Sequence, residues 1–385
     1  MRILLIRLSS LGDIVLTTPV FAFIKEAVPD AELDFLCYTQ YSAIMAQYPE
    51  IHRVLCFPKQ EMTRALRRMR LIRFWRLAKS LRCDLAARRY DHVIDLHNVT
   101  DSALAALMCP KAIRTGNRRQ LLTVFFAHRL RLEDRNERAE MHASLIAMRT
   151  VLESGALPAA AALPILPKSA VFFDENARAE AERFIQVQSL AGKKLVGIYP
   201  AASRDYKRWP AENFARLAGK IVDTWGYAIV LLGAASDRAL MEKIAAEIYT
   251  QCADAAIADS AGEPISENVV IACGLDLPVV CALLARLDFC IGADSGLMHI
   301  AAALNVPQVA LFGHSSLLKF YPLSDKARVV RHDLPCSPCT PQCARKCAHR
   351  ICIEGITVTE VWREAVQLIA EYYPELVCSC GRSAE

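Results

Sequence analysis

The stretch Ile291–Ser316, IGADSGLMHIAAALNVPQVALFGHSS, decides the fold of this chain. An apolar run over Leu287–Gly292 leads into the small-residue turn ADSG, and a short apolar helix over Met298–Leu304 follows the turn. A second apolar run covers Gln308–Phe312. A strand, a turn, a helix and a second strand in this order predict one unit of a parallel sheet in an α/β protein.

Polar residues gather where the first of these strands meets the helix. Ligands of open α/β sheets bind beyond the carboxyl ends of the strands, and a helix N-terminus offers unpaired N–H groups to phosphate. Asp294 can accept hydrogen bonds from sugar hydroxyls, and His299 can donate one to a phosphate oxygen. Ser295 and Gly296 let the backbone approach a ligand closely. The alternative is an ordinary turn in which Asp294 only caps the helix.

Length and composition indicate a well-packed protein of two domains. The chain has 385 residues, which is more than one typical core holds. Its residues are 54% hydrophobic and 23% charged, and no apolar run approaches the ~20 residues of a membrane-spanning helix. The first residues, MRILLIRLSS, read as a strand and lack the cleavage pattern of a secretion signal.

Cysteine usage favours a cytoplasmic location. The chain has 15 cysteines, which alone would suggest an oxidising compartment. Seven of them, however, lie in apolar strand-like or helix-like surroundings, where cysteine acts as a small hydrophobe: Cys37, Cys56, Cys83, Cys109, Cys273, Cys281 and Cys290.

Strands and helices alternate through both halves of the chain. The first half begins with a strand over Met1–Arg7 and a helix over Ile14–Val28, and the second begins with a helix over Asp174–Leu190 and a strand over Lys194–Tyr199. Between them, Gly155–Lys168 is rich in Pro and Ala and reads as a linker. The pattern predicts two Rossmann-like domains with a ligand cleft between them, over residues 1–160 and 170–355, followed by a helix over 356–375.

Three more loops place reactive groups at the ends of predicted strands. Asp13 follows the first strand beside a glycine, where a carboxylate suits a general base, or a helix cap. In the loop over 200–210, Ser203, Lys207 and two arginines suit a diphosphate leaving group, or a solvated loop. Asp237 follows a later strand and suits ribose hydroxyls, or the first turn of a helix.

Four blocks of the sequence resemble the bacterial lipopolysaccharide heptosyltransferases, glycosyltransferase family 9: MRILLIRLSSLGDIVLTTP, YDHVIDLH, SRDYKRWP and GADSGLMHIAAALNVPQVALFG. The resemblance implies the α/β GT-B fold, two Rossmann-like domains facing a central cleft, with the C-terminal helix packed back on the first domain. It implies transfer of a heptose from ADP-heptose to a Kdo or heptose of the lipopolysaccharide inner core, with inversion and without a metal or cofactor.

The resemblance also gives roles to single residues. It implies that Asp13 is the general base, that Ser203 and Lys207 meet the donor phosphates, and that Asp237 meets the ribose. The sugar and diphosphate are then bound by Asp294, Ser295, Gly296 and His299. Three positions depart from the family pattern: Ala202 stands where relatives have a hydroxyl, Asp237 where Glu is frequent, and Ser295 where Thr is commoner. None of these changes removes a catalytic group.

One segment is strongly basic. Between Arg53 and Asp91 there are twelve Lys or Arg against three Asp or Glu, and no acid lies between Arg64 and Arg82. Guanidinium groups suit phosphates and carboxylates, so we predict that an anionic inner-core acceptor is bound by Arg64, Arg67, Arg68 and Arg70. The helix that follows carries four more cations on its polar side, and these face either anionic lipid or only solvent: Arg73, Arg76, Lys79 and Arg82. Nucleic acid is not expected, because no aromatic interleaving accompanies the charge.

The C-terminal cysteines leave one alternative open. A CxxC motif and three further cysteines have a spacing that resembles metal ligands, and the alternative is that they are plain reduced thiols. These cysteines are Cys336, Cys339, Cys343, Cys347 and Cys352. We expect no metal.

The main prediction is a cytoplasmic glycosyltransferase peripheral to the inner membrane. The alternatives are a relative with another acceptor, including an autotransporter protein, and a non-catalytic nucleotide-sugar-binding protein, which would not need Asp13.

Overall fold

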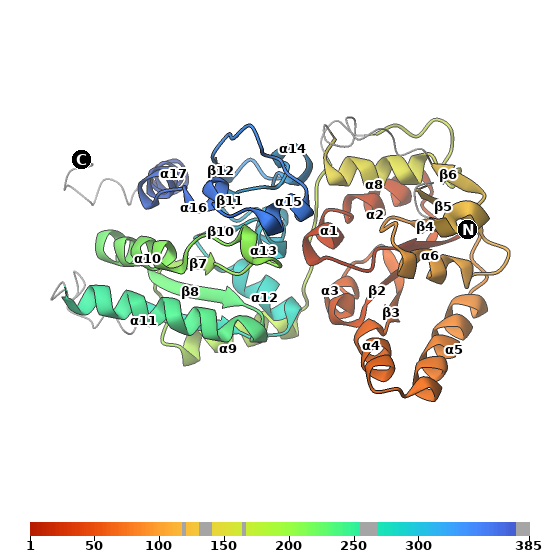
Figure 1. The fold of residues 1–385 in the computed structure, drawn as a ribbon, viewed down its shortest axis with the longest axis horizontal. Helices are drawn as coiled ribbons and strands as arrows, with labels where there is room; N and C mark the ends of the chain where they lie inside the picture. Colours follow the sequence, from red (N-terminus) through yellow and green to blue (C-terminus); the bar gives the residue numbers. More distant parts are fainter. Residues whose placement is uncertain (118–120, 131–140, 164–166, 255–267, 375–385) are drawn as a thin grey trace. The chain divides into compact units, whose positions relative to one another are not determined.

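The computed structural model describes residues 1–117, 121–130, 141–163, 167–254 and 268–374 (Figure 1). The chain divides into two compact units, Met1–Phe172 and Phe173–Glu385. Ala170 is held by the first unit, because its N–H donates to Thr18 Oγ1 at 3.1 Å and its carbonyl accepts from the Tyr48 hydroxyl at 2.6 Å. The boundary therefore lies slightly beyond the predicted start of the second domain at residue 170.

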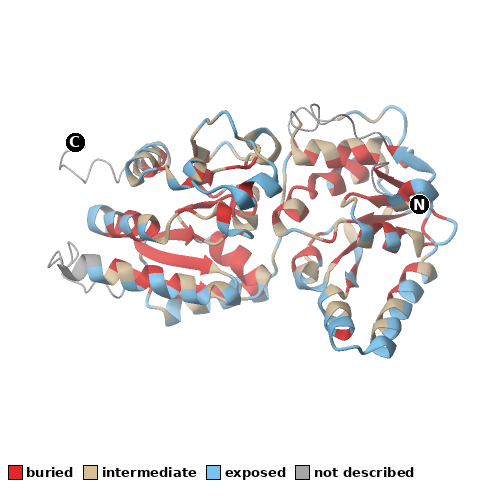
Figure 2. Ribbon diagram, in the orientation of Figure 1, coloured by how far each residue is buried: buried red, intermediate tan, exposed pale blue. Residues whose placement is uncertain are grey.

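The first unit is built on a six-stranded parallel sheet in the order β3-β2-β1-β4-β5-β6, the strand order of a Rossmann fold. Short apolar runs form its central strands because helices cover both faces, and Figure 2 shows the strands as a buried layer. The strands are β1 (Arg2–Ile6), β2 (Glu32–Tyr38), β3 (Ile51–Phe57), β4 (His92–Asp95), β5 (Ile113–Asn117) and β6 (His128–Leu130).

The helices of this unit differ from the prediction in two places. The helix predicted over Ile14–Val28 is two helices, because the hydroxyls of Thr17 and Thr18 bond to the carbonyls of Asp13 and Val15 and Pro19 starts a new helix. The basic segment forms a hairpin of two helices, of which only the second was predicted. The helices are α1 (Leu11–Val15), α2 (Pro19–Ala27), α3 (Ser42–Met45), α4 (Lys59–Arg67), α5 (Leu71–Ala87), α6 (Thr100–Leu107) and α8 (Ala143–Leu152), with short 3-10 turns η1 (Thr39–Tyr41) and η2 (Leu121–Phe125).

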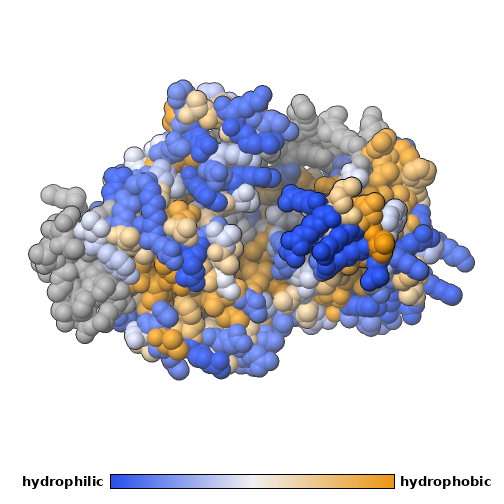
Figure 3. Space-filling view, turned by 60° about the horizontal axis from the view of Figure 1, so that its bottom comes forward, coloured by the Kyte–Doolittle hydropathy of each residue, from blue (hydrophilic) through white to orange (hydrophobic). Residues whose placement is uncertain are grey.

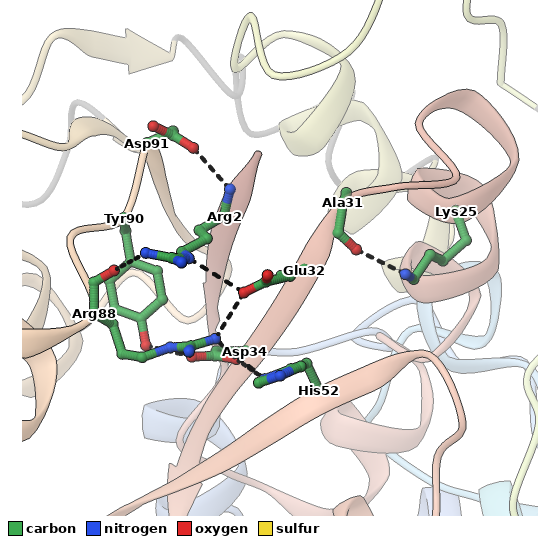
Figure 4. Close-up of polar contacts among 9 residues, drawn as sticks. All are labelled: Arg2, Lys25, Ala31, Glu32, Asp34, His52, Arg88, Tyr90 and Asp91. Atoms are coloured by element: carbon green, nitrogen blue, oxygen red, sulfur yellow. Dashed lines mark hydrogen bonds and ion pairs between the residues drawn. The ribbon is translucent and has the colours of Figure 1, made fainter.

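A buried polar network ties the end of α5 to the sheet (Figure 4). Asp34 is fully buried and accepts from Arg88 Nε at 3.0 Å and from the Tyr90 hydroxyl at 2.7 Å. Arg88 also pairs with Glu32, which in turn pairs with Arg2 at 3.2 Å. These groups lie near the starts of β1 and β2, at the edge opposite to the one where α/β sheets bind ligands. The network is therefore structural.

The second unit repeats the same architecture. Its sheet is parallel in the order β12-β11-β10-β7-β8-β9, which is the same permutation when its strands are counted from β7. The strands are β7 (Leu195–Tyr199), β8 (Ala228–Gly233), β9 (Val269–Cys273), β10 (Phe289–Ala293), β11 (Gln308–Phe312) and β12 (Ala327–Arg331). The helices are α9 (Glu175–Val187), α10 (Ala211–Trp225), α11 (Arg238–Asp254), α12 (Leu277–Leu284), α13 (Gly296–Ala303), α14 (Leu317–Phe320), α15 (Pro341–Lys346), α16 (Ile351–Glu354) and α17 (Val358–Tyr372), with 3-10 turns η3 (Asp205–Lys207) and η4 (Ala235–Asp237).

The C-terminal helix α17 packs on the second unit. Its apolar side chains Val361, Ala365 and Leu368 are buried in the core of that unit, and the helix contacts α10, β11 and β12. Trp362 stacks on Trp225 of α10 with ring centroids 4.4 Å apart. The prediction had this helix packing on the first domain, whereas its buried face lies in the core of the second. None of the described helices has the length and apolarity needed to cross a membrane.

Each sheet has one point where the strand order reverses. In the first sheet this point lies between β1 and β4, where Ile6 is paired with Asp95, and in the second between β7 and β10, where Tyr199 is paired with Gly292. Loops leave the carboxyl ends of such neighbouring strands in opposite directions and open a crevice for ligands. Most of the predicted catalytic and donor-binding residues follow one of these four strands.

Gly292, in the decisive stretch, is required by packing. A Cβ at this position would lie 1.9 Å from Cδ2 of the buried Tyr199 ring, whose hydroxyl is fixed by Gln308 Oε1 at 2.9 Å. We expect Gly292→Ala to lower the free energy of unfolding by about 2–3 kcal/mol, measured by urea denaturation. The control is Gly233→Ala, where the nearest atom is the flexible methyl end of Met241 and a smaller loss is expected. Equal losses would contradict this packing argument.

Candidate active site

The carboxylate of Asp13 is held at the strand-order reversal of the first sheet. Arg7 directly follows β1, and its Nη2 lies 2.8 Å from Asp13 Oδ1. Asp13 Oδ2 accepts from the Ser10 hydroxyl at 2.9 Å and from the Ser10 N–H at 3.2 Å. Arg7 is itself fixed by the Leu96 carbonyl, beyond the end of β4. The Asp13 side chain is 27% exposed, so a substrate hydroxyl can reach this oriented proton acceptor.

The end of β4 contributes a buried carboxylate and an imidazole. Burial raises the pKa of Asp95 to about 6, although this carboxylate accepts from the N–H groups of His97 and Asn98 and from the Ser102 hydroxyl. These bonds fix the loop that presents His97. Burial and the nearby Arg7 charge lower the pKa of His97 to about 4, so the imidazole is neutral near neutral pH. In the described part of the chain, His97 Nδ1 is buried without a hydrogen-bond partner.

Arg7 and His97 were not predicted as site residues, although they lie in the blocks MRILLIRLSSLGDIVLTTP and YDHVIDLH. Their position is the signal that could have identified them: Arg7 directly follows β1, His97 lies two residues beyond the end of β4, and these strands are neighbours where the strand order reverses. A neutral histidine in the electrostatic neighbourhood of the Asp13 carboxylate suits hydrogen bonding to sugar hydroxyls.

The predicted acceptor arginines lie at the α4–α5 hairpin. Arg64, Arg67 and Arg68 line an open hollow of about 480 Å³ together with Lys59, and Arg64, Arg68 and Arg70 line a smaller one beside it. All four arginines are exposed. Lys59, the first residue of α4, joins the hairpin to α6 through an ion pair of 2.6 Å with Asp101 in the first turn of that helix. The structure thus brings the four predicted arginines, Arg64, Arg67, Arg68 and Arg70, together on one surface of the first unit.

In the second unit, a buried ion pair joins the two strands at the reversal. Lys207 belongs to the 3-10 turn after β7, and its Nζ lies 2.7 Å from Oδ2 of Asp294 at the end of β10. Burial by itself raises the pKa of Asp294, but the Lys207 charge and hydrogen bonds from Lys207 and Ser315 outweigh it, so the pKa lies below its ordinary value. The carboxylate is therefore ionised near neutral pH, and it holds the Lys207 ammonium beside the carboxyl end of β10.

The start of α13 lies beside this ion pair. Ser295 is the N-cap residue, and its hydroxyl is buried with no hydrogen-bond partner among the described residues. The first N–H groups of a helix have no partner within the helix, and together with the helix dipole they favour an anion. His299 is buried in the same helix, which begins at Gly296. Most buried hydroxyls are hydrogen-bonded, so the Ser295 hydroxyl suits a ligand oxygen.

The two remaining predicted donor-binding residues, Ser203 and Asp237, lie after β7 and β8. Ser203 is exposed in the loop after β7. Asp237 caps the turn η4 after β8, because its Oδ2 accepts from the Ala234 N–H at 3.0 Å. This capping is the alternative that the sequence left open, and it keeps the carboxylate at the carboxyl end of the sheet.

Two residues after β11 join the site and were not predicted. Ser315 donates to Asp294, and the His314 ring meets Tyr206 edge-on with centroids 4.8 Å apart. Burial and the nearby Lys207 charge lower the pKa of His314, which keeps this ring neutral. Both residues belong to the sequence GHSS, which directly follows the second strand of Ile291–Ser316. Polar residues at the end of a predicted strand are the pattern that could have identified them.

The five C-terminal cysteines follow β12 and extend to α16 within the described residues. No group of three or more His, Cys, Asp or Glu side chains in these residues has the arrangement to hold a metal ion. Cys336, Cys343 and Cys347 are exposed, and Cys339 and Cys352 are half-buried. Hydrogen bonds from the backbone of His349 and Arg350 lower the pKa of Cys347, whereas burial raises the pKa values of Cys339 and Cys352.

Comparison with known proteins places this geometry in a family. The profile of glycosyltransferase family 9 (heptosyltransferase) matches residues 74–349. Lipopolysaccharide heptosyltransferase 2 of Salmonella typhimurium is 30% identical over 335 residues, which cover 86% of this chain and 88% of the relative. Lipooligosaccharide heptosyltransferase 2 of Haemophilus influenzae is 27% identical over 336 residues, with the same coverage of 86% and 88%.

Solved structures give the same result. The structure of Escherichia coli ADP-heptose lipopolysaccharide heptosyltransferase II superposes with a TM-score of 0.72 at 26% identity and covers 96% of this chain and 99% of its own. Both chains share the GT-B architecture of two Rossmann-like units. Because the family profile spans most of the sequence and the relatives align over nearly their whole length, this chain belongs to glycosyltransferase family 9, the heptosyltransferase family, and is a glycosyltransferase.

Proposed function

We propose that this protein transfers a heptose from ADP-heptose to a sugar of the lipopolysaccharide inner core, with inversion at the anomeric carbon and without a metal or cofactor. The observation that carries the proposal is that the reactive groups are divided between the two units, in each case at the point where the strand order of the sheet reverses. The first unit holds a proton acceptor, Asp13, and the second holds a cation, a buried hydroxyl and a helix start. The names of the relatives supply the donor and the acceptor class.

In the proposed reaction, the acceptor hydroxyl attacks the anomeric carbon on the face opposite to the leaving diphosphate. Asp13 takes the proton of that hydroxyl as the new C–O bond forms. The bond from the anomeric carbon to the diphosphate oxygen breaks, and ADP leaves with its electron pair. Lys207, the Ser295 hydroxyl and the first N–H groups of α13 stabilise the charge on ADP. Exclusion of water during this step prevents hydrolysis of the donor.

The proposed acceptor fits the charge of the first unit. Inner-core sugars and lipid phosphates are anionic, and the α4–α5 hairpin presents Arg64, Arg67, Arg68 and Arg70 at its surface. The acceptor carries lipid, so we propose that the protein works at the cytoplasmic face of the inner membrane as a peripheral protein.

A panel of donors tests the proposal. With purified full-length protein and a Kdo-lipid A acceptor, bare or already carrying a heptose, we expect nucleotide release from ADP-heptose to exceed that from ADP-glucose, UDP-glucose or GDP-mannose by ~100-fold or more. The anomeric configuration of the product, read by NMR, checks inversion. Preferred turnover of another donor, or release that does not depend on the acceptor, would contradict the proposal.

A further inference from the structure

The tip of the α4–α5 hairpin exposes large apolar side chains. Five of them lie within ten residues: Leu66 is 45% exposed, Met69 79%, Leu71 51%, Ile72 79% and Trp75 68%. Single exposed apolar residues are ordinary, but a contiguous group on a soluble protein marks an interaction surface. We call these five residues the apolar tip.

The hairpin is held together and packed on its unit by residues outside the apolar tip. Ala65 on α4 is buried, and an Arg73–Glu61 ion pair of 3.2 Å links the two helices. The side chains that α5 buries, Leu81 and Leu85, lie toward its other end. The tip is therefore not needed for packing of the hairpin on its own unit.

Two polar contacts hold the base of the hairpin to the rest of the first unit. The Lys59–Asp101 ion pair holds the start of α4, and the Asp34 network holds Arg88 beyond the end of α5 (Figure 4). The turn between the helices is tight, with the Arg70 N–H donating to the Ala65 carbonyl at 2.8 Å and Met69 in the left-handed region at φ +53°. A rigid base and a tight turn present the tip in a defined position.

Cations surround the apolar tip. Figure 3, which turns the bottom of Figure 1 forward, shows strongly hydrophilic and strongly hydrophobic side chains side by side over this hairpin. The segment from Arg64 to Arg82 holds eight Lys or Arg and no acid. Exposed cations next to the tip include Arg67, Arg68, Arg70 and Arg76.

We propose that the apolar tip inserts into the interfacial region of an anionic lipid bilayer, with the surrounding cations on the lipid headgroups. Helices that lie in this interface combine Lys and Arg with Trp and aliphatic side chains, as this hairpin does. Tryptophan favours the interface, and basic residues favour negatively charged leaflets. A second copy of the chain fits less well, because a symmetric contact would bring two such basic surfaces together.

One consequence of this inference, the placement of the acceptor, rests on the proposed function. If the acceptor is a lipid-linked sugar, the inserted tip brings the neighbouring arginines to the headgroup surface where that sugar begins. Vesicle binding itself does not depend on the identity of the donor or the acceptor, so it can be tested separately from transfer.

The test is vesicle co-sedimentation of the full chain. We expect binding to phosphatidylcholine vesicles that contain about a third phosphatidylglycerol, weakening as salt is raised, and much weaker binding to pure phosphatidylcholine. The triple variant Met69→Gly/Ile72→Ser/Trp75→Ser is expected to bind the anionic vesicles at least ~10-fold less tightly. Glycine at position 69 keeps the left-handed turn. The matched control is Val187→Ser, an equally exposed apolar residue (70%) of the second unit, which is expected to bind normally.

Tryptophan fluorescence tests insertion directly. Of the four tryptophans, Trp209 is buried and Trp225 and Trp362 stack on each other in the second unit. A blue shift upon addition of anionic vesicles is therefore expected from Trp75 and should be absent in Trp75→Phe.

Four results would overturn the inference. They are absence of vesicle binding, equal binding of the triple variant, an unchanged Trp75 emission, and a wild-type dimer in sedimentation velocity that the triple variant abolishes, which would assign the tip to a second copy. Transfer to a delipidated acceptor should be unchanged in the triple variant. If the wild type transfers nothing, the proposed function fails while the vesicle result stands.

Discussion

Replacing Asp13 with alanine is expected to lower kcat by about 10³-fold or more, while the affinity for ADP, measured by calorimetry, stays within about threefold. The acceptor hydroxyl then keeps its proton during attack on the anomeric carbon. The donor affinity survives because the groups that we propose for the nucleotide and diphosphate, Lys207 and the start of α13, belong to the other unit. Single-turnover rates with ADP-heptose and acceptor give the chemical step separately from product release.

A matched control separates catalysis from folding. Asp30→Asn changes an exposed aspartate of the same unit that lies just before β2, at the amino edge of the sheet, and it is expected to leave kcat unchanged. Asp13→Ala also leaves Arg7 without its ion-pair partner, so the melting temperatures of both variants should be compared. Equal loss of ADP binding and transfer in Asp13→Ala would show that Asp13 supports the structure and is not the base.

Replacing Lys207 with methionine is expected to lower the free energy of unfolding of the second unit by about 3–5 kcal/mol and to weaken ADP binding. The variant leaves the Asp294 carboxylate, which is 8% exposed, buried without its cation. The pair contributes stability above the ordinary pKa of the carboxylate, about 4, and that contribution is lost as the pH falls below this value and Asp294 is protonated. The stability difference between wild type and variant should therefore shrink in acid.

Another ion pair of the same unit provides the control. Lys243 and Glu212 have the same N–O distance of 2.7 Å, but their side chains are 60% and 48% exposed. Because water screens this pair, Lys243→Met should change the free energy of unfolding by less than about 1 kcal/mol. The double variant Lys207→Met/Asp294→Asn should recover part of the stability but not the ADP affinity. Similar losses from both lysine variants would contradict the role of burial.

The sequence predicted the parts of the molecule that depend on local pattern. Apolar runs followed by small or polar residues located β1, β2, β3, β4, β7, β8, β10 and β11, and therefore the loops in which Asp13, Lys207 and Asp294 lie. Strands that the pattern missed are short or lie toward the edges of the sheets. For example, β5 over Ile113–Asn117 contains an arginine, a glycine and an asparagine and has no continuous apolar run.

Other features depend on partners that are distant in the sequence. The pairing of Asp13 with Arg7 and of Lys207 with Asp294 requires knowing which strands are neighbours. The position of α17 was predicted by analogy, and its amphipathic pattern shows that one face is buried without showing against which sheet. The break before Pro19 depends on hydroxyls that compete with the helix backbone, which an apolar periodicity does not register.

The repeated strand permutation has a consequence for how such enzymes diversify. Each half is a complete Rossmann sheet with its own core, and the groups that we propose for the donor and for the acceptor are encoded in separate halves of the sequence. Exchange of the second half by recombination near Phe172 would then alter the nucleotide sugar that is used while leaving acceptor selection in place. Under the proposed division of labour, such an exchange would change the donor without a simultaneous change in the groups that bind the acceptor.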